Sequence, residues 1–177
     1  MICGGVRVND VGARLRWRLP AGEAVPHAWL RRVLLGLLLL LAYPAGAEVS
    51  FETGPLAIES GSGTLRFEVE VAVTPEQRRH GLMFRESLEP DQGMLFDFGR
   101  TAPVTMWMRN TFISLDMLFI DGDGRIARIV ADTEPMSDAV IGSGGPVRAV
   151  LELAAGTSAE LGIAVGDHVV HPIFAAP

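Results

Sequence analysis

The alternation of apolar and polar side chains in residues 64–73 constrains the fold of this chain more than any other feature. Apolar side chains take the odd positions and charged ones lie between them: Leu65, Phe67, Val69, Val71 and Val73 against Arg66, Glu68 and Glu70. Successive residues of a β-strand point to opposite faces, so this pattern predicts a strand with one buried and one wet face.

Further strand-like runs follow along the chain, at 94–98, 104–109, 115–121, 125–131, 147–154 and 168–173. Two capping-box sequences, Thr74-Pro75-Glu76-Gln77 and Thr157-Ser158-Ala159-Glu160, predict short helices over 75–84 and up to Leu161. Many short strands with two short helices indicate a mainly β (α+β) domain. We expect an antiparallel sheet curled like a barrel.

The first 47 residues have the order of a secretory leader. Arg31 and Arg32 precede an apolar run over 33–43, and Ala45-Gly46-Ala47 then forms a cleavage site. Because 11 apolar residues fall short of the roughly 20 that span a bilayer, a retained membrane anchor is the weaker alternative. We expect cleavage after Ala47, translation starting near Val25, and a single periplasmic or secreted domain over 48–177.

The expected mature part is acidic. It contains 9 Arg, no Lys and 19 Asp plus Glu, which gives 9 − 19 = −10. Nucleic acid and anionic membranes both require a basic surface, so neither is an expected partner. Cys3 is the only cysteine and belongs to the leader, so the domain is expected to have no disulfide and no thiol nucleophile.

Residues 104–121 combine two strand-like runs with a group of unlike polar side chains. Trp107 and Arg109 share a strand face by the period of two, while Asp116 and Glu152 each oppose the apolar row of their own strand. If these faces converge, they form a polar hollow. The candidate ligand-binding residues are Arg85, Trp107, Arg109, Asn110, Asp116 and Glu152.

Three functions remain open for this set. Arginines beside an indole suit an anionic or carbohydrate ligand of the cell envelope, with Asp116 and Glu152 orienting the arginines. The second possibility is an envelope hydrolase that uses these two carboxylates as a pair, although arginine neighbours would lower the pKa of both. The third is a structural or interaction protein without a ligand pocket, in which arginine–carboxylate pairs only fix strand register.

Metal and cofactor chemistry have weaker support. Asp121-Gly122-Asp123-Gly124 fits a hairpin turn better than a calcium loop, because the required glycine position holds Ile126. His168 and His171 would point to opposite faces of a strand. The methionines, among which Met106 and Met108 share a face, leave copper(I) as an alternative to core packing. We expect no metal and no cofactor.

Several blocks of the chain resemble the domain-of-unknown-function 192 family of small, often exported bacterial and archaeal proteins. The resemblance covers about residues 65–172 and rests on five ordered blocks: Gly81–Arg85, Gly93–Phe96, Trp107–Thr111, Leu115–Asp121 and Val150–Leu153 with Gly166-Asp167. It implies a compact, largely β domain with short helices and no particular reaction. Arg109 stands where the family usually has lysine, which makes Schiff-base chemistry improbable there.

Overall fold

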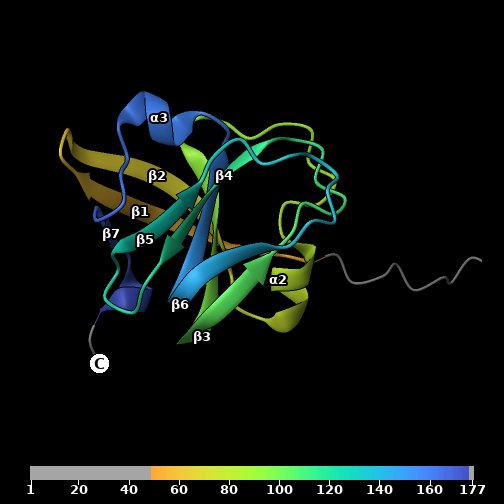
Figure 1. Ribbon diagram of the computed structural model, residues 1–177, viewed down its shortest axis with the longest axis horizontal. Helices are drawn as coiled ribbons and strands as arrows, with labels where there is room; N and C mark the ends of the chain where they lie inside the picture. The colour runs from red at the N-terminus through yellow and green to blue at the C-terminus, as the bar shows by residue number, and fades with distance from the viewer. Residues whose placement is uncertain (1–48, 176–177) are drawn as a thin grey trace, which may run out of the picture. The chain divides into compact units, whose positions relative to one another are not determined.

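Seven strands form one curled sheet in the order β5-β4-β6-β3-β2-β1-β7 (Figure 1). The strands are β1 (Glu52–Ser60), β2 (Gly63–Ala72), β3 (Gln92–Met106), β4 (Leu115–Ile120), β5 (Ile126–Val130), β6 (Ile141–Ala154) and β7 (His168–Val170). The short helices are α2 (Pro75–His80) and α3 (Thr157–Leu161), and a 3-10 turn follows at Pro172–Phe174. The predicted mainly β fold with a curled sheet and two short helices is confirmed.

This computed structural model describes residues 49–175. The expected leader, with its apolar run 33–43 and its cleavage site after Ala47, lies outside the described residues. So does the expected translation start near Val25. Among residues 49–175, no helix is long and apolar enough to cross a bilayer.

The sheet is mixed, because β2 and β3 run parallel, with Val69 opposite Gly93 and Val71 opposite Leu95. All other neighbouring strands pair antiparallel. The expected antiparallel sheet is therefore confirmed except at this one pair. Parallel neighbours cannot be joined by a tight hairpin, and here the chain crosses from β2 to β3 through α2 and residues 81–91.

The two edges of the sheet meet at one end of the curl. Arg125, just before β5, forms an isolated antiparallel bridge with His168 of β7. The amide of Ile126 donates to the carbonyl of Asp167 at 2.9 Å, and the amide of Val169 donates to the carbonyl of Gly124 at 2.7 Å. These bonds cover part of both edge strands, which would otherwise expose unpaired backbone groups.

Two apolar clusters lie on opposite faces of the sheet. The first draws side chains from all seven strands and fills the inside of the curl, with Ile58, Leu118 and Val169 fully buried. The second lies on the other face, where β3, β4 and β6 are covered by Leu82 and Met108 from the connecting segments. β4 is buried along its whole length as a consequence.

Helix α2 begins as the sequence predicts. The Thr74 side chain accepts a hydrogen bond from the Gln77 amide at 3.1 Å, and the Gln77 side chain accepts one from the Thr74 amide at 2.9 Å. The helix ends at His80 and not at Phe84, because Gly81 has a φ of 50°. A Cβ at Gly81 would lie 3.1 Å from the Phe96 ring, so glycine lets this segment pack closely on the sheet.

The other differences concern element boundaries. Strand β1 was not predicted, and the expected strands 94–98 and 104–109 are one bent strand, β3, with register shifts after Asp97 and Pro103. Strand β6 begins at Ile141, six residues before the expected strand 147–154. Helix α3 is capped by Gly156 without a side-chain hydrogen bond, so its expected capping box does not form.

Candidate functional site

A pocket of about 310 Å³ lies between α2 and the end of β3, on the face of the second apolar cluster. Its wall is largely apolar and carries cationic side chains, and one carboxyl reaches it from β6. The lining residues used below are Arg78, Arg79, His80, Trp107, Arg109 and Glu152. In Figure 1, α2 lies on the side of the sheet from which the long connecting loops project.

Glu152 forms the floor of this pocket. The residue is 4 % exposed and, among residues 49–175, no side chain or amide gives its carboxyl a hydrogen bond or an ion pair. Its neighbours in the ladder are Met94 of β3 and Met117 of β4, whose side chains cannot donate a hydrogen bond. Burial raises the pKa of Glu152 from 4.5 to about 8, so the carboxyl is mostly protonated at neutral pH.

The pocket mouth carries an indole and two arginines. Trp107 is 40 % exposed, and the Arg109 guanidinium lies 5.8 Å from the centre of its ring. Arg109 also pairs through Nε with Asp138 at 2.6 Å, an exposed contact that contributes little stability. Arg79 is exposed and makes no ion pair with the described residues. Positive charge is therefore available at the mouth.

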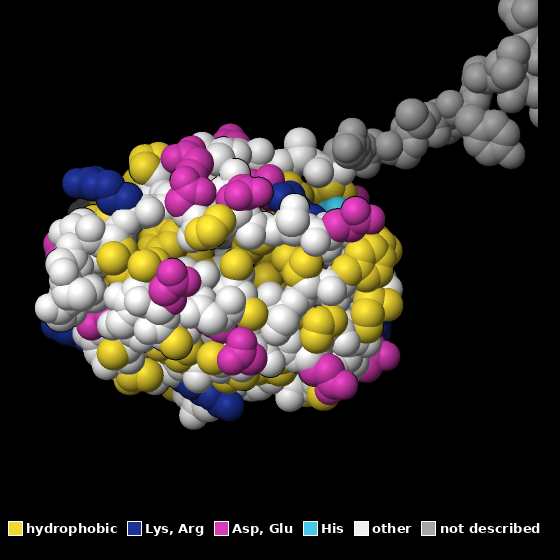
Figure 2. Space-filling view, turned by 90° about the horizontal axis from the view of Figure 1, so that it is seen from above, with side chains coloured by type: hydrophobic (Ala, Val, Ile, Leu, Met, Phe, Trp, Pro, Cys, Tyr) yellow, Lys and Arg dark blue, Asp and Glu magenta, His cyan; other side chains and the backbone are white. Residues whose placement is uncertain are grey.

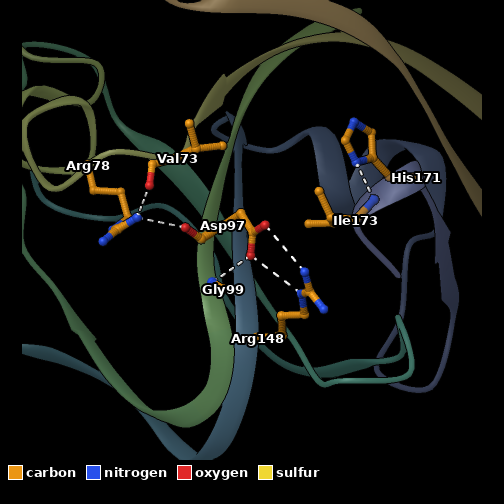
Figure 3. A network of polar contacts seen from close by, with 7 residues as sticks. All are labelled: Val73, Arg78, Asp97, Gly99, Arg148, His171 and Ile173. Atoms are coloured by element: carbon orange, nitrogen blue, oxygen red, sulfur yellow. Dashed lines mark hydrogen bonds and ion pairs between the residues drawn. The ribbon is translucent and has the colours of Figure 1, made fainter. Parts of the chain in front are cut away.

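Arg78 has a different environment, although it also lines the pocket (Figure 3). Its guanidinium donates to the carbonyl oxygens of Val73 and Asp97, the second at 2.9 Å, and lies 5.3 Å from the Phe98 ring. The Asp97 carboxylate accepts from the Gly99 amide at 2.8 Å and pairs with Arg148 at 3.4 Å. Arg78 thus ties α2 to the sheet through these contacts.

A second pocket adjoins the first and shares five of its lining residues: Arg79, His80, Met83, Trp107 and Arg109. Asn110 lines this second pocket and has a φ of 56°. The Asn110 carbonyl accepts a hydrogen bond from the Phe84 amide at 2.8 Å, which joins the segment after α2 to the segment after β3. Asn110 therefore helps to fix the wall shared by the two pockets.

Hydrophobic side chains are exposed around this end of the domain. Phe84, Phe112 and Trp107 are 58 %, 47 % and 40 % exposed, and the rings of Phe84 and Phe112 meet edge to face at 6.1 Å. Figure 2 shows acidic and hydrophobic side chains interspersed over one face of the domain. Aromatic surface near a pocket is typical of a binding site.

Asp116 does not belong to the pocket. Its carboxylate accepts four hydrogen bonds: from the Ser158 hydroxyl at 2.5 Å and amide at 2.9 Å, the Asp132 amide at 3.0 Å and the Gly156 amide at 3.2 Å. Burial by itself raises the pKa of Asp116, but these four bonds outweigh it and hold that pKa below 3.8. Asp116 anchors α3 and the loop after β5, and it pairs with no arginine among residues 49–175.

Arg85 also lies outside both pockets. Its guanidinium pairs with Glu70 of β2 at 2.5 Å, and both side chains are partly exposed. The structure thus brings together Trp107, Arg109 and Glu152, places Asn110 in the adjoining pocket, and separates Arg85 and Asp116 from them. Sequence reasoning missed Arg79, His80 and Met83, although the basic last turn of α2 was a usable signal.

The methionines that suggested copper(I) mainly fill the second apolar cluster. Met94, Met106, Met108 and Met117 are buried there, and the Met108 sulfur accepts a hydrogen bond from the Thr133 hydroxyl at 3.2 Å. Among residues 49–175, no group of three His, Cys, Asp or Glu side chains is placed to hold a metal ion. The Asp121 carboxylate accepts from the Asp123 and Arg125 amides, as in a tight turn.

Comparisons with known proteins place the chain among uncharacterised relatives. The model of the domain-of-unknown-function 192 family, described as "Uncharacterized ACR", matches residues 57–171. A Sinorhizobium meliloti structure, described as a candidate transcription regulator, is 50 % identical with a TM-score of 0.68, covering 70 % of this chain and 97 % of that one. A Novosphingobium aromaticivorans structure of unknown function is 36 % identical with a TM-score of 0.67, covering 73 % and 90 %. No curated protein matches.

Proposed function

Because the chain belongs to the domain-of-unknown-function 192 family, whose description assigns no reaction, we propose its function from the pocket itself. The domain is a binding module of the cell envelope for a small anionic sugar, such as a uronic acid. One observation carries the proposal: an exposed indole and two arginines at the mouth stand above a buried, unpartnered carboxyl at the floor.

Each of these groups matches one part of such a ligand. A sugar ring has an apolar face that stacks on an indole such as Trp107, and a carboxylate accepts paired hydrogen bonds from an arginine such as Arg79 or Arg109. A buried polar group without a partner destabilises the protein. A hydroxyl of the ligand would remove that cost by hydrogen-bonding to Glu152.

The location in the envelope is supported by the leader-like sequence before residue 48. To test it, the full chain is expressed in a bacterium that has an outer membrane, and the product in the periplasmic fraction is analysed by intact mass. We expect a protein that begins at Glu48. A product that keeps its leader and remains with the cytoplasm would overturn export.

Trp107 offers a direct test of binding, because it is the only tryptophan in residues 48–177. Its fluorescence is followed while glucuronate, galacturonate or neutral glucose is added to the mature domain, and thermal unfolding is measured in parallel. We expect saturable changes with at least one uronate and weaker ones with glucose. No change with any uronate in either measurement would refute the proposal.

Arg79→Gln should weaken uronate binding about tenfold, the effect of losing one charged hydrogen bond of about 1.4 kcal/mol. The matched control is Arg100→Gln, which alters an exposed arginine of β3 that lines neither pocket. Equal affinities for the two variants would show that the arginine at the mouth does not contact the ligand.

A further inference from the structure

The proposed function accounts for the first pocket but not for the larger pocket beside it. The second pocket has a volume of about 480 Å³, against about 310 Å³ for the first, and the two have one wall in common. Pockets that enclose a drug-sized ligand begin at about 300 Å³, and a single sugar is smaller than such a ligand. The first pocket by itself therefore accommodates one uronate, and the second offers room for a further part of the ligand.

The second pocket has two polar side chains of its own. Glu76 and Asn110 line it and do not line the first pocket. Glu76 is exposed in the first turn of α2 and makes no ion pair with residues 49–175. A carboxylate accepts hydrogen bonds, and a primary amide both donates and accepts them. Together these two groups suit the hydroxyls of a sugar.

The Asn110 backbone is fixed, while most of its side-chain amide is free for a ligand. Its φ of 56° is left-handed, and its carbonyl accepts from the Phe84 amide at 2.8 Å. Among residues 49–175, the side chain makes one hydrogen bond, from Nδ2 to the Met83 sulfur at 3.8 Å. Because a thioether is a weak acceptor, the Asn110 amide keeps its capacity to bind a hydroxyl.

From these two adjoining pockets we propose that the ligand is an acidic oligosaccharide of at least two sugar units. The uronate lies in the first pocket and a neighbouring neutral sugar lies in the second, where Glu76 and Asn110 bind its hydroxyls. The inference rests on the proposed function, since it takes binding of a uronate in the first pocket as given. It adds the class of ligand and assigns the residues that hold its second unit.

The wall between the pockets explains why one ligand would extend over both. Arg79, Trp107 and Arg109 line each pocket, so a ligand that crosses from one to the other stays in contact with the indole and the cations. A second unit that is covalently linked to the first adds contacts without a second loss of translational and rotational freedom. Affinity should therefore rise when the uronate carries a second sugar.

Ligands that differ by one sugar test the inference directly. Methyl glucuronide is compared with two disaccharides of glucuronate and glucose, one with the glucuronate at the reducing end and the other with it at the opposite end. Trp107 fluorescence is titrated with each compound at pH 7. We expect at least one disaccharide to bind about tenfold more tightly than methyl glucuronide.

Asn110→Gly removes the amide without straining the backbone, because glycine readily adopts a φ of 56°. It should weaken binding of the tighter disaccharide at least about threefold more than binding of methyl glucuronide. The matched control is Asp132→Gly, which alters another exposed residue with a left-handed φ, of 50°, that lines neither pocket. It should change neither affinity. If Asn110→Gly does not fold, Glu76→Gln replaces it with the same expected result.

Equal affinities of methyl glucuronide and both disaccharides for the native domain would overturn the inference. A folded Asn110→Gly variant that weakens the monosaccharide and the disaccharide equally would also overturn it. In both cases the proposed function would stand, because a uronate would still bind. If none of these compounds binds and glucuronate itself does not, the proposed function fails and the inference with it.

Discussion

Asp116 and Glu152 point to opposite faces of the sheet, although their strands are hydrogen-bonded neighbours. The ladder places Asp116 opposite Leu153 and Met117 opposite Glu152, so the two carboxyls differ by one residue in register. A shift of one residue reverses the face of a strand side chain. Asp116 therefore reaches α3, while Glu152 reaches the pocket, and the carboxylate pair of the hydrolase hypothesis is not assembled.

Because the two carboxyls lie in different surroundings, we expect their substitution to affect stability differently. Substitution of Asp116 removes an acceptor that holds two segments together. Asp116→Ala should lower the free energy of unfolding by about 2 to 4 kcal/mol at pH 7, because four donors lose their acceptor and the two that belong to Ser158 are buried. Urea denaturation measures the loss. Asp123→Ala, an exposed carboxylate in the turn before β5, should change stability by less than about 0.5 kcal/mol.

The loss from Asp116→Ala should also depend on pH. A pKa that is lower in the folded state stabilises the protein above the unfolded value, and this contribution disappears as pH falls through the folded pKa. The difference between native and variant should therefore shrink below pH 3.8. A difference that stays constant down to pH 2 would contradict this role for the Asp116 charge.

The contribution of Glu152 to stability should depend on pH in the opposite sense to that of Asp116. The folded state holds the proton up to about pH 8 and the unfolded state releases it near 4.5. The unfolding free energy should thus fall as pH rises through this window, by up to about 1.4 kcal/mol per pH unit. Glu152→Gln should remove that slope. Urea denaturation of both proteins at pH 5, 6.5 and 8 measures the difference, and parallel pH profiles would contradict the buried neutral carboxyl.

Gly93 tests how tightly β3 packs against β6 beside the pocket floor. A Cβ at Gly93 would lie 2.7 Å from the Glu152 carbonyl oxygen and 2.8 Å from a Leu153 methyl. Gly93→Ala should therefore destabilise the domain by about 1 to 3 kcal/mol. Gly142→Ala on β6, where a Cβ would meet nothing within 4 Å, should have little effect. The midpoints of thermal unfolding of the two variants are compared. Equal midpoints would contradict the close contact of β3 with β6 at Gly93.

Met136 tests the strain in the loop that follows β5. It is 54 % exposed and has a φ of 61°, while its amide donates to the Thr111 carbonyl at 3.0 Å. Left-handed backbone is disfavoured for residues with a Cβ. Met136→Gly should therefore be about 0.5 to 1 kcal/mol more stable than Met136→Ala, which removes the same side chain beyond Cβ. A less stable glycine variant would contradict the left-handed backbone.

The fold was largely predictable because its signals are local. Alternation over 64–73 predicted β2, and the hydrogen bonds of Thr74 and Gln77 formed as expected. The parallel pairing of β2 with β3 was not predictable, since no residue pattern distinguishes it from an antiparallel pair. Strand β1 was missed because its few buried positions, such as Leu56 and Ile58, are mixed with exposed ones.

The site was only partly predictable, because it depends on which segments the topology brings together. Trp107 and Arg109 both line the pocket as expected, but not through the period of two, because β3 ends at Met106 and Arg109 lies in a turn. The same rule could not give the register of β4 against β6, which separates Asp116 from Glu152. The partners of the arginines, Glu70 for Arg85 and Asp138 for Arg109, come from distant segments and have no motif.

The parallel pairing of β2 with β3 has a consequence for how this architecture can diversify. A chain that leaves one strand and returns alongside it in the same direction must pass over a face of the sheet. The covering segment, here α2 and residues 81–91, therefore lies over one face of the sheet without being part of the sheet. Substitutions in that segment can change the lining of the pocket while the strands that hold Glu152 stay as they are.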